Sequence, residues 1–234
     1  MVAVSAYGSV ARGRSYPLVC TSMLYKNAVR LQNLVLGTHM AGYIFVSPKS
    51  DPGMGLPLLD PLLGGGRRPT MGTCRPDLRR YVQVGGSIFV ISGSLGKHIS
   101  QYVIGGLDVD SKLDSQLEAF EKYPENRLNF DGKGVRSGNI IVTAAGEQHE
   151  RDSHTKFDTR IKNYLEGSNP IVLESPAEIE LGRSRSLDIL ARVFDKPKAA
   201  TIREIIGRNR KLSDKQVGLL REALSQLKIE ARNG

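Results

Sequence analysis

The sequence predicts an α+β fold in which a small strand-rich barrel or curled sheet precedes a helical C-terminal third. Short apolar runs broken by glycine pairs fill much of the first two thirds of the chain. After residue 150 the hydrophobic period changes from two to 3.6, and helix-capping sequences follow. We therefore expect an N-terminal extension at 1–39, a strand-rich domain at 40–174 and a helical subdomain at 175–234.

The charge of the chain is uneven along its length. The 234 residues carry a formal net charge of +9; lysine and arginine dominate both flanks, whereas the middle is acidic. This asymmetry suggests an anionic partner, of which nucleic acid is the commonest; a merely solvated basic surface is the alternative. No apolar run approaches the roughly 20 residues of a membrane helix, so no membrane partner is expected. Two cysteines are too few for a disulfide framework or a structural zinc site, which predicts a protein of the reducing cytoplasm. No metal site and no cofactor are expected.

The first 39 residues differ from the rest of the chain. They contain no acidic residue and show no clean hydrophobic period. This composition is similar to that of a transit peptide, but it also suits an upstream extension in front of a start at Met40, which we favour. We expect this arm to pack loosely or against a neighbour.

Four apolar runs predict strands in the central domain. The run "AGYIFVSP" is stopped by Pro48, because proline cannot donate to a strand ladder. Ser87–Ile91 follows a turn at Gly85 and Gly86, and "QYVIGGLDVDSKL" contains a glycine pair that marks a bulge or a tight bend. The fourth run is "NIIVTA". Short strands with glycine corners are typical of small barrels.

The segments between these strands carry their own signals. The stretch after Pro48 is rich in proline and glycine, which predicts a long loop, and loops of this length are usually functional. "RPDLRR" is expected to form a helical turn or a tight loop that opens at Pro76. "SQLEAFEKYP" predicts a short helix that ends before Pro124.

Helices are expected after residue 150. "DTRIKNYLEG" predicts a helix with Gly167 at its C-terminus. Capping boxes are predicted for the pairs Ser175/Glu178, Thr201/Glu204 and Ser213/Gln216. The last helix places Val217, Leu220, Leu224 and Leu227 on one face. "TIREIIGRNRKLSDKQVGLLREAL" is compatible with a DNA-reading helix-turn-helix, but simple packing onto the barrel is favoured because the second helix shows few base-reading side chains.

A cluster of arginines precedes the buried strand Ser87–Ile91. Its members are Arg67, Arg68, Arg75, Arg79 and Arg80. Arginine suits bidentate contacts to phosphate or guanine, so the cluster predicts an anion site. The alternative is that one or two of these arginines pair with the acidic middle of the chain. The strand exit "SGSLGKH" consists of small residues whose backbone amides can approach a phosphate.

The stretch "GEQHERDSHTKFDTR" brings two histidines and several carboxylates together. His149 and His154 are five residues apart, a spacing that does not suit metal ligands on one helix. A histidine–carboxylate pair could perform general acid–base catalysis, and two solvated loop histidines are the alternative. Cys74 is a further candidate, as a nucleophile near one of these histidines.

Three stretches of the chain resemble the nucleotide modification associated domain, type 2. They are "YIFVSPKSDPGMGLP", "GTCRPDLRRYVQVGGSIFVISGS" and "YVIGGLDVDSKL". The shared features are an opening strand, a D-x-G-type loop, a T-C-[KR]-P-x-[IL]-R segment and a G-S exit; the chain has Gly86-Ser87 where the family tends to show Asp-Trp. The resemblance implies a link to bacterial and phage DNA modification or phage defence. By analogy it also suggests a PUA-like barrel that binds a flipped or modified base.

Together these features predict a module that binds nucleic acid, DNA above all, or modified nucleotides. The arginine cluster would hold the phosphate backbone or a base edge at the mouth of a pocket. The residues expected to line that pocket are Asp51, Gly53, Gly55, Cys74, Ser92, Gly93 and Ser94. The alternative is an enzyme acting on a nucleotide or modified base. Its catalytic candidates are Asp51, Cys74, His149 and Glu150. A third alternative is a protein-interaction domain with a basic surface.

Overall fold

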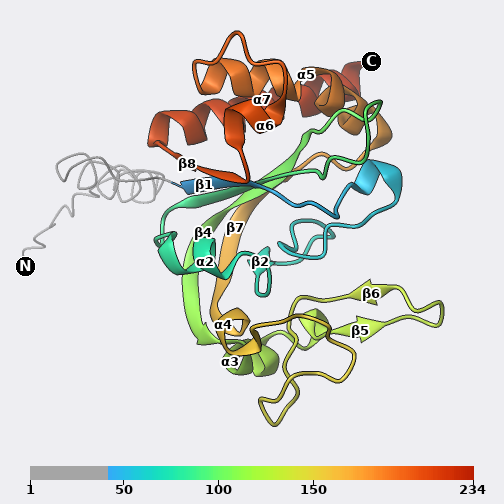
Figure 1. Cartoon of the computed structure of the whole chain (residues 1–234), viewed down its shortest axis with the longest axis vertical. Coiled ribbons are helices and arrows are strands. Elements are labelled where there is room, and N and C mark those ends of the chain that lie inside the picture. The colour runs from blue at the N-terminus through green and yellow to red at the C-terminus, as the bar shows by residue number, and fades with distance from the viewer. Residues whose placement is uncertain (1–41) are drawn as a thin grey trace, which may run out of the picture. The chain divides into compact units, whose positions relative to one another are not determined.

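The computed structural model describes residues 42–234, which belong to one compact unit built on a six-stranded sheet (Figure 1). The strand order is β2-β7-β4-β3-β1-β8. The strands are β1 Gly42–Val46, β2 Thr70–Met71, β3 Ser87–Ile91, β4 Val103–Ser115, β7 Lys162–Val172 and β8 Asn209–Leu212. The predicted extension at 1–39 lies outside the described residues.

Helices and a small second sheet surround the large sheet. The helices are α2 Pro76–Tyr81, α3 Gln116–Lys122, α4 Phe157–Arg160, α5 Pro176–Val193, α6 Ile202–Ile206 and α7 Asp214–Asn233, with 3₁₀ helices η1 Pro52–Met54 and η2 Pro124–Asn126. The second sheet pairs β5 Asn129–Phe130 with β6 Arg136–Ser137. Helices α5, α6 and α7 lie on one side of the large sheet, whereas α3, α4 and the small sheet lie toward the far end of the long strands β4 and β7 (Figure 1).

The large sheet is open and mixed. Only β1 and β3 run parallel; every other neighbouring pair within this sheet is antiparallel. The strands β2 and β8 are its two edges and do not pair with each other. The predicted α+β class with C-terminal helices is therefore confirmed, but the sheet is not closed into a barrel.

The centre of the sheet is covered on both faces. All five residues of β3 are buried, and Ile44, Phe89 and Val90 are completely inaccessible. Continuous apolar runs of this kind are typical of strands with two covered faces. Parallel neighbours need a crossover, and residues 47–86 supply it through the predicted long loop and α2. This crossover carries much of the site described below.

The glycine pair in β4 confirms the predicted irregularity. A Cβ atom on Gly105 would lie 2.2 Å from the carbonyl oxygen of Ile171, and one on Gly106 would lie 2.6 Å from the Phe89 ring. Both contacts are closer than real Cβ atoms allow, so glycine permits the neighbouring strands to approach. The pairing register shifts at this point, between Gly106 and Asp108.

Two predicted elements are wrong. The predicted helix "DTRIKNYLEG" is a short α4 followed by β7, because Tyr164 and Leu165 are both fully buried on opposite faces of the sheet. Because both faces of β7 are covered, its apolar residues do not alternate with polar ones. The apolar residues at 161, 164 and 165 then have the spacing of a helix. The run "NIIVTA" is buried from 139 to 142 but forms only isolated bridges, not a strand.

The C-terminal third belongs to the core of the sheet. Ser175 and Ser213 form complete capping boxes, and Thr201 caps α6 through its side chain. The predicted apolar face of α7 is confirmed, since Leu220, Leu224 and Leu227 are buried. The basic turn expected in a helix-turn-helix is the edge strand β8, and the larger of the two hydrophobic clusters in residues 42–234 joins residues of the sheet with residues of α5, α6 and α7. The expected boundary at 174/175 therefore does not separate two cores. Across residues 42–234 every helix is too short or too polar for a bilayer crossing.

Candidate functional site

A cleft of about 520 Å³ opens where the chain leaves β1. We call it the first cleft. The residues that line it are Ser47, Pro48, Lys49, Ser50, Pro57, Leu59, Asp60, Thr73, Cys74, Arg136, Gly138, Asn139, Ser153, His154, Thr155 and Arg160. Ligands of open sheets that contain parallel strands often bind beyond the carboxyl ends of those strands, and β1 belongs to the parallel pair of this sheet.

The buried carboxylate of Asp60 ties the walls of the first cleft together. It accepts hydrogen bonds from the backbone N–H groups of Gly72 at 2.8 Å, Thr73 at 2.9 Å, and Cys74. The side-chain amide of Asn139 donates to it at 2.9 Å. Four donors compensate the desolvation of a buried carboxylate, so Asp60 acts here as a structural anchor.

Gln116 at the start of α3 links the same two walls. Its amide nitrogen donates to the carbonyl of Gly72 at 2.6 Å, and its oxygen accepts from the backbone N–H of Ile141 at 2.7 Å. The hydroxyl of Thr73 donates to the carbonyl of Asn139 at 2.6 Å. The segments around 73 and 139 are thus held side by side, although they are far apart in the sequence.

Three cations line the first cleft. Arg160 donates from Nε to the carbonyl of Thr155 at 2.9 Å and from Nη1 to the carbonyl of Thr73 at 3.1 Å. No hydrogen bond among the described residues uses its Nη2. Lys49 is exposed and makes no ion pair with the described part of the chain, and Arg136 has a buried Nε atom without a partner there. The cleft therefore offers unused cationic donors.

His154 reaches the first cleft and is oriented by a buried carboxylate. Its Nδ1 lies 2.6 Å from Oδ1 of Asp152, whose side chain is completely buried. Gln148 donates to the other oxygen of Asp152 at 2.8 Å, and Arg136 lies 3.5 Å from Oδ1. Burial raises the pKa of Asp152, but the hydrogen bonds from His154 and Gln148 outweigh it and hold the pKa below its ordinary value. An ionised aspartate that fixes one imidazole nitrogen is the arrangement of a general base.

Cys74 lines the first cleft, in surroundings that disfavour its thiolate form. Burial, reinforced by the nearby carboxylate of Asp60, raises the pKa of the thiol to about 12. The reactive form of cysteine is the thiolate, which is therefore scarce at neutral pH.

Arg79 was expected to contact a ligand, and the structure corrects this expectation. Its side chain is completely buried. It donates to the backbone carbonyls of Cys74 at 3.0 Å, Asn163 at 2.9 Å and Arg160 at 2.7 Å, and also to those of Thr73 and Lys162. Burial lowers the pKa of Arg79 to about 10, so that the side chain remains charged at neutral pH. Arg79 holds the backbone behind the first cleft and has no donor left for a phosphate.

The other four arginines of the predicted cluster do not converge. Arg67 and Arg68 line a separate shallow pocket, where Arg68 pairs with Asp110 at 3.1 Å. Arg80 is exposed and its guanidinium lies 5.6 Å from the Tyr81 ring centre. Arg75 lines a second cleft, next to the first one.

Most of the other predicted site residues lie elsewhere. Asp51 is completely buried and pairs with Arg183 at 2.5 Å, so it does not face the first cleft. Gly53 and Gly55 belong to the turn around η1 and do not line the cleft either. Ser92 and Gly93 are buried, and Gly93 packs against the carbonyl of Pro48. Ser94 lines the second cleft.

The predicted pair His149 and Glu150 is also outside the lining of the first cleft. His149 accepts a hydrogen bond from the backbone N–H of Arg151, and Glu150 is exposed. The neighbouring pair Asp152 and His154 takes the place that was expected for them. No group of three or more His, Cys, Asp or Glu side chains within residues 42–234 is arranged to hold a metal ion.

Several residues of the site were missed at the sequence level. Asp60 carried a usable signal, since a lone carboxylate in "PLLDPLL" is expected to be buried and hydrogen-bonded. Arg160 ends α4, within a segment for which a longer helix was predicted. Nothing in the local sequence singles out Lys49 or Arg136.

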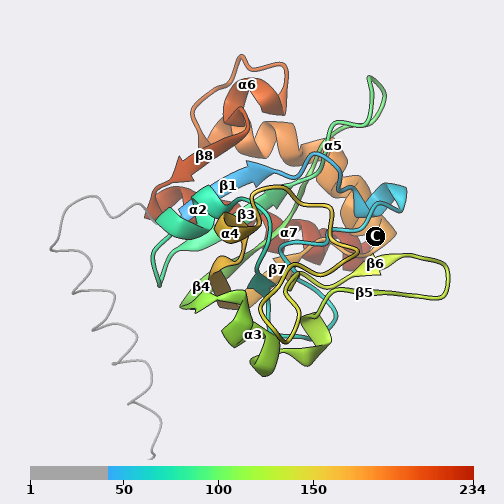
Figure 2. The ribbon, with the colours of Figure 1, turned by 60° about the horizontal axis from the view of Figure 1, so that its bottom comes forward.

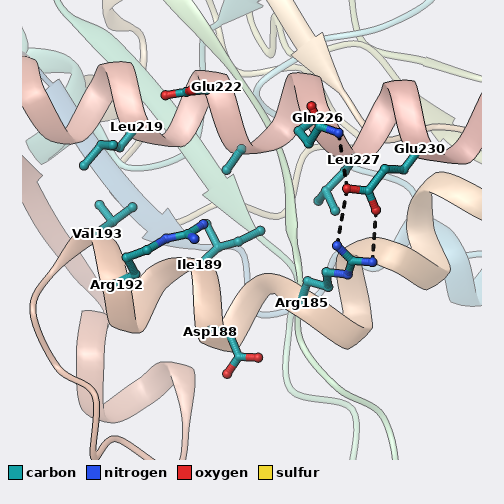
Figure 3. Close-up of a pocket in the computed structure, with 11 residues that line it drawn as sticks. Arg185, Asp188, Ile189, Arg192, Val193, Leu219, Glu222, Gln226, Leu227 and Glu230 are labelled. Carbon is teal, nitrogen blue, oxygen red and sulfur yellow. Dashed lines mark hydrogen bonds and ion pairs between the residues drawn. The ribbon is translucent and has the colours of Figure 1, made fainter.

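A third cavity, a groove between α5 and α7, has a different character (Figure 3). It has a volume of about 690 Å³ and an apolar floor that includes Ile189 and Leu227. Arg185 spans the groove to Glu230 at 3.0 Å, and Gln226 bonds the same carboxylate (Figure 3). Its charges are mixed, so it does not favour an anionic ligand as the first cleft does.

Comparison of the chain with known proteins identifies no relative. The resemblance to the nucleotide modification associated domain, type 2, remains a prediction based on the sequence motifs. The chain matches no protein-family model, no curated protein and no solved structure.

Proposed function

We propose that residues 42–234 bind a nucleotide, free or within a nucleic acid, through a phosphate held in the first cleft. The observation that supports this most is the gathering of Lys49, Arg136 and Arg160 around one cavity. Among the described residues that line it, Asp60 is the only one with a carboxylate, and four donors already satisfy this group. Cationic donors in a partly enclosed site are strong phosphate ligands, and a cleft of about 520 Å³ is within the usual size of small-ligand sites.

The base of the nucleotide would lie against an apolar wall rather than an aromatic one. Among the described residues that line the first cleft, none is Phe, Tyr or Trp; His154 supplies a single imidazole, and Pro48, Pro57 and Leu59 supply the apolar surface. Such a wall discriminates between bases by their shape more than by stacking. Recognition of a modified base in DNA, a PUA-like binding mode, and a place in DNA modification or phage defence are parts of this proposal that rest on the resemblance alone.

The proposal is tested by replacing Lys49 with alanine. Lys49 is exposed and its side chain makes no hydrogen bond or ion pair within residues 42–234, so the Lys49→Ala protein should keep its melting temperature. We expect the affinity for nucleoside monophosphates to fall by about tenfold, since one charge-assisted contact contributes about 1.5 kcal/mol. Isothermal titration calorimetry at low salt, with each of the common ribo- and deoxyribonucleoside monophosphates, measures this.

Lys133 provides the matched control. It is exposed in the turn between β5 and β6 and does not line the first cleft. Lys133→Ala removes the same charge and should leave the affinity unchanged. Equal losses in both variants would mean that only the overall charge matters, and the absence of any nucleotide binding at low salt would end the proposal.

A second candidate function is an enzyme that acts on the bound nucleotide. The specific observation in its favour is the pair Asp152 and His154 at the cleft, in which the imidazole is fixed at 2.6 Å by a buried carboxylate. The free Nε2 atom could accept a proton from an attacking water molecule. This reading replaces the earlier catalytic candidates His149 and Glu150.

The enzyme candidate predicts a defined loss in His154→Gln. Wild-type protein incubated with a nucleotide pool or short DNA should yield a new product in mass spectrometry, and His154→Gln should lower its formation by at least about a hundredfold. Nucleotide affinity should change little, because the cations remain. His149→Gln is the control, and it should retain full turnover. No product from the wild-type protein would leave binding as the only function proposed.

A further inference from the structure

A second cleft lies directly beside the first one. It has a volume of about 900 Å³, and Pro48 lines both clefts. The residues that line it come from the ends of β1 and β3, from α2, and from α6 and β8. Figure 2 shows α2, β1 and β8 close together at this edge of the large sheet. Because the clefts share a wall, a ligand longer than one nucleotide that occupies the first cleft would continue into the second.

Two arginines of the second cleft have no partner among the described residues. Arg203 at the start of α6 and Arg208 before β8 are both exposed, and no hydrogen bond or ion pair in residues 42–234 uses their guanidinium groups. A third arginine, Arg75, is neutralised by Asp77 at 2.5 Å and held against the Phe45 ring. Asp77 neutralises only Arg75, so the exposed Arg203 and Arg208 give the second cleft a net positive charge.

Neutral donors and a basic loop complete this surface. The side chains of Ser94, Gln101 and Asn209 line the second cleft beside the two free arginines. Lys97 and His98 lie in the exposed loop between Ser94 and Gln101. A groove that carries two unpaired arginines and neutral hydrogen-bonding side chains suits a sugar–phosphate backbone, whose charges repeat along the strand.

We propose that the second cleft binds the sugar–phosphate backbone adjacent to the nucleotide in the first cleft, so that the ligand is a single nucleic-acid strand rather than a free nucleotide. This inference rests on the proposed function and restricts its ligand to a nucleic-acid strand. Arg203 and Arg208 contact phosphates of the neighbouring nucleotides, and they contribute nothing to a mononucleotide, which does not extend past Pro48.

The test compares two probes on the same variants. The probes are a nucleoside monophosphate and a fluorescein-labelled single-stranded DNA of random sequence, about ten nucleotides long, within the range of known single-strand site sizes. We expect wild-type protein to bind the DNA at least about tenfold more tightly than the monophosphate at low salt. The double variant Arg203→Ala/Arg208→Ala should lose that advantage while keeping its affinity for the monophosphate. The slope of log affinity against log salt should fall by about 1.4, or 0.7 for each lost contact to a single strand.

A control with the same charge change is Arg192→Ala/Arg232→Ala. Arg192 is exposed at the groove between α5 and α7, and Arg232 lies at the far end of a 20-residue helix, about 30 Å from β8. This variant should bind both probes like the wild-type protein. Melting curves of both double variants should match that of the wild-type protein, because the four arginines are exposed.

The outcomes separate this inference from the proposed function. Equal affinity for DNA and monophosphate, or equal losses in the two double variants, would overturn the second cleft as a backbone site while the first cleft stands. Loss of monophosphate binding in Arg203→Ala/Arg208→Ala would also overturn it, since the clefts would then form one mononucleotide site. If neither probe binds, both proposals fail together.

Discussion

Replacing Arg79 with methionine should reduce the free energy of unfolding by about 3–5 kcal/mol, the loss typical of a buried charged group whose partners are left unpaired. The aliphatic volume is largely kept, so the loss comes from the backbone carbonyls of five residues that Arg79 now satisfies. Each buried carbonyl without a donor costs about 1–3 kcal/mol, and water entering the gap would compensate only a part. Equilibrium unfolding in urea measures the difference.

The neighbouring Arg80 provides the control for this prediction. It belongs to the same helix, carries the same charge and is exposed. Arg80→Met should change the stability by no more than about 0.5 kcal/mol. If Arg79→Met does not fold, Arg79→Lys, which keeps the charge but not the planar fork of donors, should fold with an intermediate loss. A loss below about 1 kcal/mol in Arg79→Met would show that the carbonyls find other donors.

The change Asp60→Asn should have the second largest effect. An asparagine offers one acceptor oxygen, and its amide would face backbone N–H groups that now donate to the carboxylate from Gly72, Thr73 and Cys74. We expect a loss of about 2–4 kcal/mol in urea unfolding. The first cleft should also lose its shape, because Asp60 joins the walls at 73 and 139. Nucleotide affinity should therefore fall even at temperatures where the variant is fully folded.

Asp188→Asn is the matched control for Asp60→Asn. Asp188 is exposed on α5 at the groove of Figure 3, outside the lining of the first cleft, and no hydrogen bond or ion pair within residues 42–234 uses its carboxylate. It should leave stability and nucleotide affinity within error of the wild-type values. Stability lost without any change of affinity in Asp60→Asn would mean that the cleft walls are held by other contacts. A stable Asp60→Asn protein would contradict the anchoring role altogether.

Local signals in the sequence were sufficient for elements that depend on local chemistry. The strands β1 and β3, the helical turn after Pro76, the helix capped by Ser115 and the capping boxes at Ser175 and Ser213 all agree with the prediction. In each case the controlling interaction lies within a few residues of the element. The glycine pair of β4 predicted a bulge or a tight bend, and the pairing register does shift beside it, between Gly106 and Asp108.

The failures share a different cause. Three features depend on residues far away in the sequence: whether the sheet closes, the formation of strand β7, and the burial of Arg79. An isolated run cannot show that both of its faces will be covered, and this is why residues around 164 imitated a helix. The five arginines are close in the sequence but diverge in space, whereas the cations of the first cleft come from three distant segments. Proximity along the chain was therefore a poor guide to the site.

The edge strand β8 has a consequence for how the chain folds during synthesis. β8 pairs with β1, the first described strand, and nearly all of the described chain lies between them. Until residues 209–212 leave the ribosome, one side of β1 has unpaired backbone groups next to buried Tyr43, Ile44 and Phe45. Exposed apolar strand edges are templates for association with other chains. Nascent chains of this protein should therefore depend on chaperones until the last strand closes that edge.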